Sequence, residues 1–222
     1  MNVLSLFDGM SCGQIALKNL GVKVDNYYAS EIDKYAIKIA KKNFPDMIHV
    51  GDVTKLSYSD YRKCLVREKS SEYIQDIPKS RRIDLIMGGS PCQGFSRAGK
   101  NLNFEDPRSK LFFEFVRLVK ECKPKYFLLE NVKMTKEHRD TISKFLGVEP
   151  IYIDSALVSA QTRKRYYWTN IPYIFGPINQ HITLRDIIQT EGELEGSEVD
   201  ERMVTKLGKA YCLTARYDGA VW

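Results

Sequence analysis

Short apolar runs alternate along the chain with segments in which apolar residues recur at helical spacing. NVLSLF (2–7) is followed by a glycine-bearing turn and by QIALKNL, whose apolar positions fit one face of a helix. NYYASE (26–31) and the following KYAIKIAKKNF repeat this order. Five further β-rich runs occupy residues 47–52, 83–89, 125–131, 150–156 and 165–170. Strands separated by helices predict an α/β domain with a doubly wound, mostly parallel sheet.

The segment from Arg108 to Cys122 predicts one more amphipathic helix. Its apolar positions fall on one stripe, which comprises Leu111, Phe112, Phe115, Val116, Leu118, Val119 and Cys122. We interpret the phenylalanines in and beside this stripe, including Phe113, as core residues.

Polar residues follow the apolar runs at the points where strands should end: Asp8, Glu31, Asp52, Cys92, Glu130 and Asn131. Ligands bind at the carboxyl ends of parallel strands, so these side chains should face one cleft. The first three suggest a nucleoside-bearing cofactor, with its ribose hydroxyls on Glu31 and its adenine amino group near Asp52. Any single acid among them, taken alone, is also compatible with a helix cap or a solvated loop residue.

Length and composition narrow the class of protein. A chain of 222 residues buries one proper core, so we expect a single globular domain with at most a small appendage. The five cysteines form no CxxC pair and are odd in number, which argues against a disulfide framework or a metal site. No apolar run approaches the ~20 residues of a membrane span, and the N-terminus lacks secretory features. We expect an intracellular protein that is neither secreted nor membrane-bound.

The charge pattern is weaker evidence. A net charge of +6 is compatible with a polyanionic partner but does not demand one. The basic stretch 61–82 is interpreted as a solvated helix and loop. The stretch GGSPCQGFSRAGKN (88–101) is too rich in Gly and Ser for a helix or central strand, and it predicts a shaped loop that carries Cys92.

Six motifs in order resemble those of the cytosine-5 DNA methyltransferases: FDGMSCG (7–13), ASEID (29–33), GDV (51–53), GGSPCQGFS (88–96), LLENV (128–132) and QTRKRYYW (161–168). The spacing of Gly9 and Gly13 and the segment SKLFFEF (109–115) are similar to the eukaryotic de novo branch. The resemblance implies a Rossmann-like S-adenosylmethionine-dependent methyltransferase fold. It places the catalytic domain in residues 1–172 and the start of an incomplete target-recognition region in 173–222.

The resemblance also implies roles for individual residues. The catalytic group comprises Cys92, Glu130, Arg163 and Arg165. The cofactor-binding group, for S-adenosylmethionine, comprises Phe7, Asp8, Gly9, Glu31, Ile32, Asp52, Val53 and Pro91. The substrate-binding group comprises Ser90, Gln93, Asn131 and Gln161. No metal is implied.

The family's chemistry explains these residue types. Cytosine C5 is a poor nucleophile, so a thiolate on Cys92 would add to C6 and form an enamine that attacks the methyl group. Glu130 would bind or protonate N3 of the base. Arg163 and Arg165 lie two apart, so on an extended segment they point the same way, toward the base carbonyl and the cysteine loop. The alternatives are a buried inert thiol, a helix-capping acid and a surface arginine pair.

The implied partner is DNA with its target cytosine flipped out, and the loop 96–110 is the candidate to close over it. Alternatives that stay open are an RNA (tRNA) methyltransferase and a non-catalytic relative that acts as a binding or regulatory subunit. A homodimer or a complementing chain is a further possibility, with some of the phenylalanines at the interface.

The end of the chain carries the weakest signals. Residues 191–201 hold six acids and no base, which is typical of a solvated linker, and 209–222 reads as the start of an isolated strand. The family's later motifs and final helix are absent from the sequence. We therefore expect a truncated chain, a proteolysed product or half of a split enzyme. The expected location is the cytoplasm of a bacterium or phage host, or the nucleus of a eukaryote.

Overall fold

The computed structural model describes residues 1–59, 64–67, 82–90, 107–187 and 209–211. The chain forms two compact units. Unit 1 comprises Met1–Pro150 and Tyr167–Pro172, and unit 2 comprises Ile151–Tyr166 and Tyr173–Trp222. The strand β10 (Lys164–Thr169) contributes its first half to unit 2 and its second half to unit 1.

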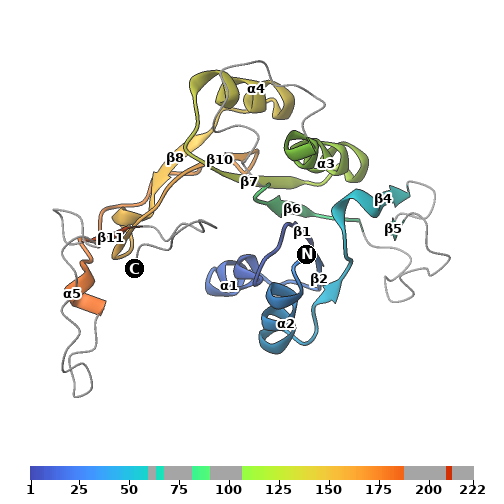
Figure 1. The fold of residues 1–222 in the computed structure, drawn as a ribbon, viewed down its shortest axis with the longest axis horizontal. Helices are drawn as coiled ribbons and strands as arrows, with labels where there is room; N and C mark the ends of the chain where they lie inside the picture. Colours follow the sequence, from blue (N-terminus) through green and yellow to red (C-terminus); the bar gives the residue numbers. More distant parts are fainter. Residues whose placement is uncertain (60–63, 68–81, 91–106, 188–208, 212–222) are drawn as a thin grey trace. The chain divides into compact units, whose positions relative to one another are not determined.

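Unit 1 contains most of the regular structure (Figure 1). Its elements before the basic stretch are β1 (Asn2–Leu6), α1 (Cys12–Asn19), β2 (Asn26–Ser30), α2 (Lys34–Asn43), β3 (Ile48–His49), the 3-10 turn η1 (Val53–Lys55) and β4 (Leu56–Ser59). Those that follow are β5 (Cys64–Arg67), β6 (Leu85–Gly88), α3 (Pro107–Cys122), β7 (Tyr126–Val132) and α4 (Lys136–Leu146).

The main sheet of unit 1 has the strand order β3-β2-β1-β6-β7-β10. β1 pairs in parallel with β2 on one side and with β6 on the other, and β6 pairs in parallel with β7. The strand order therefore reverses at β1, and the carboxyl ends of β1, β2, β6 and β7 share one edge of the sheet. A ligand of such a sheet binds at this edge, next to the reversal point.

Helices cover both faces of this sheet. On one face, Val3, Tyr27 and Met87 form a core cluster with Leu17 of α1 and Ala40 of α2. Figure 1 shows α1 and α2 on one side of the strands and α3 on the other. Among the α3 residues whose burial the structure describes, from 110 onward, Phe112, Phe115 and Leu118 are fully buried. The predicted doubly wound α/β fold and the core role of these two phenylalanines are confirmed.

Local signals explain where the helices begin and end. The Asp33 carboxylate caps α2 by accepting hydrogen bonds from the backbone N–H groups of Tyr35 and Ala36, at 2.8 and 2.9 Å. Gly147 ends α4 with a φ of 72°, a left-handed conformation that glycine adopts at little cost.

Unit 2 has fewer regular elements: β8 (Ile151–Asp154), the 3-10 turn η2 (Ser155–Leu157), β9 (Gln161–Thr162), α5 (Leu184–Ile187) and β11 (Ala210–Tyr211). The rings of Tyr152 and Tyr166 pack with centroids 5.4 Å apart. Lys209 is 6% exposed, and its Nζ donates to the carbonyl oxygens of Ser159, at 2.9 Å, and Ile182.

Three expectations from the sequence differ from the structure. Within the stretch 61–82, residues Cys64–Arg67 form a strand that pairs antiparallel with β4, where a solvated helix was expected. Residues 107–110 of the expected loop open α3. The strand start near residue 210 is not isolated, because β11 pairs in parallel with β9.

The acidic stretch 191–201 lies outside the described residues. Among the helices of the described part, none is both long and apolar enough to cross a bilayer.

Candidate active site

The turn after β1 has an unusual backbone. Phe7, Gly9 and Ser11 all have left-handed φ angles, of 56°, 59° and 62°. Glycine adopts this region freely, but phenylalanine and serine do so only at a cost of about 1–3 kcal/mol each. Such strain persists where neighbouring interactions fix the backbone, and it is found most often at ligand-binding sites.

Asp8 fixes this turn from within. One carboxylate oxygen accepts from the Tyr27 hydroxyl at 2.7 Å, and the other accepts from the Ser11 hydroxyl. Burial and the adjacent Asp8 carboxylate raise the pKa of Tyr27 well above its ordinary value, so its hydroxyl stays a donor. Gly13 lies against the same group, since a Cβ there would stand 2.9 Å from the Tyr27 hydroxyl oxygen and 2.5 Å from Met87 Sδ. One carboxylate oxygen of Asp8 therefore binds Ser11 within the turn, and the other ties the turn to β2 through Tyr27.

Glu31 connects the turn after β1 to the end of β2. Its Oε2 accepts from the backbone N–H of Gly9 at 2.8 Å. Its Oε1 accepts from the N–H groups of Ile32 and Asp33, at 2.7 and 2.9 Å. A carboxylate has about four acceptor positions and three of them are occupied here, so Oε2 can still accept one further donor. Beside it, Ile32 is 75% exposed, an apolar surface next to a charged acceptor.

Asp52 lies after β3 and caps η1. Its Oδ1 accepts from the backbone N–H of Thr54 at 2.9 Å and from the Thr54 hydroxyl at 2.8 Å. The next residue, Val53, is only 4% exposed, so its side chain belongs to the core and not to an open surface.

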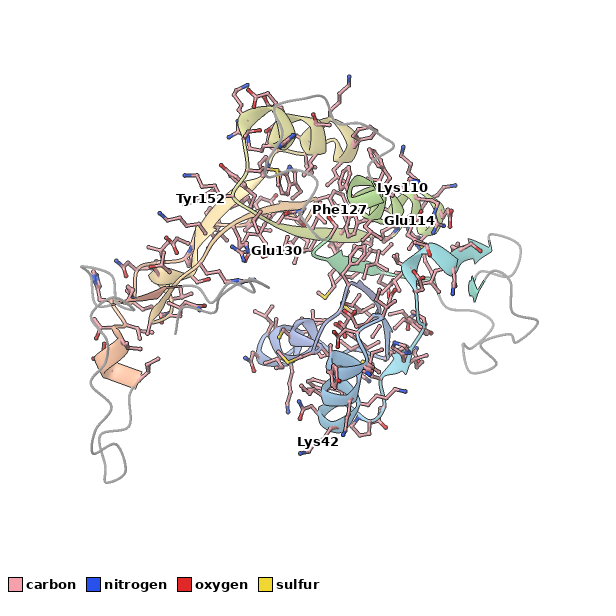
Figure 2. The ribbon with its side chains drawn as sticks, viewed as in Figure 1. Lys42, Lys110, Glu114, Phe127, Glu130 and Tyr152 are labelled. Atoms are coloured by element: carbon pink, nitrogen blue, oxygen red, sulfur yellow. The ribbon has the colours of Figure 1, made fainter. Side chains whose placement is uncertain are left out.

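Gly89, just after β6, lies close to the side chain of Glu130 in β7. A Cβ on Gly89 would stand 2.8 Å from Glu130 Oε2, so the bare glycine leaves the space that this carboxyl group uses. Glu130 and Phe127, both labelled in Figure 2, belong to β7, and their spacing of three residues places them on opposite faces of the strand. Asn131 is 2% exposed, and its Nδ2 lies 3.4 Å from both the carbonyl and the hydroxyl oxygen of Ser90, which is 4% exposed.

The remaining predicted residues divide into two groups. Gln161, Arg163 and Arg165 belong to unit 2, where the two arginines are half-buried and Lys164 between them is exposed, as expected for alternating directions. The N–H of Arg163 donates to Asp154 Oδ1 at 3.0 Å. Pro91, Cys92 and Gln93 lie outside the described residues.

The structure adds residues to the site that the sequence did not single out. Tyr27 was interpreted only as part of a strand, and nothing in its neighbourhood predicts a bond to Asp8 nineteen residues earlier. Gly89 stood in a recognised motif, but its role as space for Glu130 required the pairing of β6 with β7.

Comparison with known proteins identifies the family of the chain. The profile of the family described as C-5 cytosine-specific DNA methylase matches residues 1–148. The type II methyltransferase M1.ScrFI of Lactococcus lactis subsp. cremoris is 49% identical over 116 residues, which are 52% of this chain and 25% of that protein. The type II methyltransferase M.NgoBV of Neisseria gonorrhoeae is 36% identical over 188 residues, 75% of this chain and 40% of that protein.

One solved structure is similar to about three quarters of the chain. The crystal structure of a protein described as a "putative DNA modification methyltransferase encoded within prophage" from E. coli has a TM-score of 0.56 and 30% identity, covering 76% of this chain and 46% of that one. The chain thus spans between a quarter and a half of the length of these relatives. They are bacterial and phage proteins, and they give no support to the resemblance to the eukaryotic de novo branch. The chain belongs to the C-5 cytosine-specific DNA methylase family.

Proposed function

We propose that this chain carries the catalytic region of a DNA cytosine-5 methyltransferase. The observation that carries the proposal is the shared sheet edge of unit 1. The first turn and Glu31 lie there after β1 and β2, and Glu130 lies near the end of β7. The family match covers the same residues.

S-adenosylmethionine fits the β1–β3 side of this edge. Glu31 would accept from the ribose through the position still open on Oε2, and exposed Ile32 offers an apolar surface for the adenine ring. Asp52 would accept from the adenine amino group, while Phe7, Asp8 and Gly9 would line the methionine end through the backbone of the strained turn. Val53 would contribute only through its backbone, and Pro91 completes the expected set. When bound, the cofactor supplies an electrophilic methyl group.

Cys92 is the proposed nucleophile. Its thiolate forms a bond to C6 of cytosine, and Glu130 donates a hydrogen bond or proton to N3 so that the ring accepts the electron pair. C5 then carries the nucleophilic electrons and would take the methyl group, while the bond from the methyl carbon to the cofactor sulfur breaks and S-adenosylhomocysteine leaves. Loss of the C5 proton to a base, cleavage of the bond between C6 and the Cys92 sulfur, and return of any proton on N3 to Glu130 regenerate the aromatic ring, the thiolate and the carboxyl group.

Other residues orient the base and the cysteine loop. Arg163 and Arg165 would contact the base carbonyl, and Gln93 and Gln161 the nucleic acid. Ser90 and Asn131 were expected to bind substrate directly. Their burial and mutual contact support an indirect role, in which they hold the start of the cysteine loop, at Ser90, to the end of β7.

Duplex DNA is the proposed substrate. Its target cytosine would be flipped out, because a base inside a helix cannot present C6 to the thiolate. The relatives from Lactococcus lactis and Neisseria gonorrhoeae are both named type II methyltransferases. These names support a role in DNA methylation, within or beside a restriction-modification system.

Methyl transfer tests the proposal directly. Labelled S-adenosylmethionine is offered with duplex DNA, and in parallel with tRNA, and the labelled base is identified after hydrolysis. We expect 5-methylcytosine in the DNA arm only. Label in tRNA alone would favour an RNA cytosine-5 methyltransferase, and binding of nucleic acid without methyl transfer would favour a non-catalytic regulatory relative.

A further inference from the structure

Arg117 of α3 binds the segment that follows Asp52. Its Nη2 donates to the carbonyl oxygens of Leu56, at 2.7 Å, and Val53, at 3.3 Å. Its Nη1 donates to Glu121 Oε1 at 2.8 Å, and its Nε to Glu114 Oε2 at 2.9 Å. These bonds tie α3 to η1 and to the start of β4.

The turn held in this way has Asp52 at its other end. Asp52 caps η1, and Leu56, whose carbonyl Arg117 binds, closes it. The backbone bonds within the turn run from Lys55 N–H to Asp52 O and from Leu56 N–H to Val53 O. So short a turn has little rigidity of its own, because 3-10 hydrogen bonds are few and poorly aligned. Its position depends on what binds it from outside.

We propose that Arg117 is a positioning residue for the adenine end of the cofactor site, acting through the turn that carries Asp52. The inference rests on the proposed function, because it takes Asp52 as the acceptor of the adenine amino group. It adds a residue of α3, 64 positions along the chain from Val53, to the determinants of cofactor affinity.

The guanidinium group suits this task in a way that an ammonium group does not. Its donors point in fixed directions and reach two carbonyl groups and two carboxylates at once. Burial alone would lower the pKa of Arg117, but the hydrogen bonds to Glu121 and Glu114 raise it above the ordinary value. Glu121 extends the clamp, since its Oε2 accepts from the N–H of Tyr58 at 3.0 Å.

The test is a double-mutant cycle on the affinity for S-adenosylhomocysteine, measured by calorimetry. Arg117→Met should bind it about tenfold more weakly than the wild-type protein. In an Asp52→Ala background the same change should cost less than about twofold, because the residue it positions is gone. Arg139→Met is the matched control: Arg139 is 30% exposed against 31% for Arg117, and it pairs with Asp140 on α4.

Two further measurements separate positioning from folding. Arg117→Lys keeps the charge and the aliphatic stem, so it should fold and lose about threefold in affinity. Amide hydrogen exchange at Lys55 and Leu56 should speed up in both variants without ligand. The inference would be overturned if Arg117→Met weakened binding equally in the wild-type protein and in Asp52→Ala, or if Arg117→Met left the affinity unchanged. A wild-type protein that does not bind S-adenosylhomocysteine would instead overturn the proposed function on which it rests.

Discussion

The ends of β1 and β2 and the ends of β6 and β7 lie on the same edge of one sheet, yet different interactions fix them. At β1 and β2, the carboxylates of Asp8 and Glu31 accept short hydrogen bonds from five partners in all. At β6 and β7, a glycine makes room for Glu130, and Asn131 reaches Ser90 only at 3.4 Å. Hydrogen bonds to two carboxylates fix the proposed cofactor side, and on the proposed base side the missing Cβ of Gly89 sets how closely Glu130 can approach β6.

The difference matches what each side has to do. A cofactor pocket gains affinity when its acceptors are already oriented, because no ordering cost is left for the binding step. A catalytic carboxyl group has to meet a base that arrives by flipping, so it benefits from a position set by shape. Substitutions on the two sides should therefore affect different kinetic constants.

The largest effect is expected at the thiol. Cys92→Ser should abolish methyl transfer and the covalent adduct with DNA that contains 5-fluorocytosine, because a hydroxyl is far less acidic than a thiol. Fluorine cannot leave C5 as a cation, so the wild-type adduct should survive denaturation. Replacement of Cys12, Cys64, Cys122 or Cys212 should leave it intact. An adduct mapped to one of those four would remove Cys92 from the chemistry.

A change at Gly89 should damage the base side alone. In Gly89→Ala the new methyl group would displace the Glu130 carboxyl group, and we expect kcat to fall about 100-fold, a typical consequence of a 1 Å misplacement. Affinity for S-adenosylhomocysteine should stay within about twofold. Gly176→Ala is the control, because a Cβ there meets nothing within 4 Å. Equal losses of kcat and cofactor affinity would show that the two sides are not independent.

Glu31 should show the opposite pattern. Glu31→Ala should weaken cofactor binding by about 1.5–3 kcal/mol, the value of a charge-assisted hydrogen bond, with kcat little changed at saturating cofactor. Glu31→Gln should be nearly as harmful, because all three backbone partners donate and a glutamine amide has a single acceptor oxygen. Calorimetry measures both variants, and unchanged affinity in Glu31→Ala would remove the ribose assignment.

The smallest effect is expected at Tyr27. Tyr27→Phe removes the bond to Asp8 and should cost about 1–2 kcal/mol of unfolding free energy in urea titrations. The pKa of Tyr27 is raised in the folded state, so above pH ~10 the unfolded chain loses this proton first. The wild-type protein should therefore lose stability more steeply with rising alkaline pH than Tyr27→Phe does. Tyr35→Phe, at a 67% exposed residue, should leave that slope unchanged.

The sequence predicted the elements whose signal is local. All seven apolar runs named as strands correspond to strands of the structure, and the stripe from Arg108 to Cys122 is α3. The hairpin of β4 and β5 was missed because LSYS and CLVR are too short to show a period. β9 was missed because its two residues owe their extended form to pairing with β11, about fifty residues later.

For the candidate site, the sequence predicted which residues lie at the ends of the strands but not what they contact. The placement of Asp8, Glu31 and Asp52 follows from where apolar runs stop. Their bonding partners do not, because Glu31 binds an amide twenty-two residues earlier, and Arg117 binds carbonyl groups more than sixty residues earlier. Such contacts depend on the packing of α3 and on the register of β1 against β2, which no local pattern encodes.

The central position of β1 has a consequence for how the chain is made. Its apolar residues pair with β2, which follows closely, and with β6, where Val3 faces Leu85. On a ribosome β1 and β2 emerge together, but one edge of β1 stays unpaired until β6 has been synthesised. Closing that long loop carries an entropic cost before any contact repays it, so folding of the sheet should be slow and limited by this pairing. During that interval the open edge of β1 is the point at which a chaperone, or another nascent chain, would add a strand.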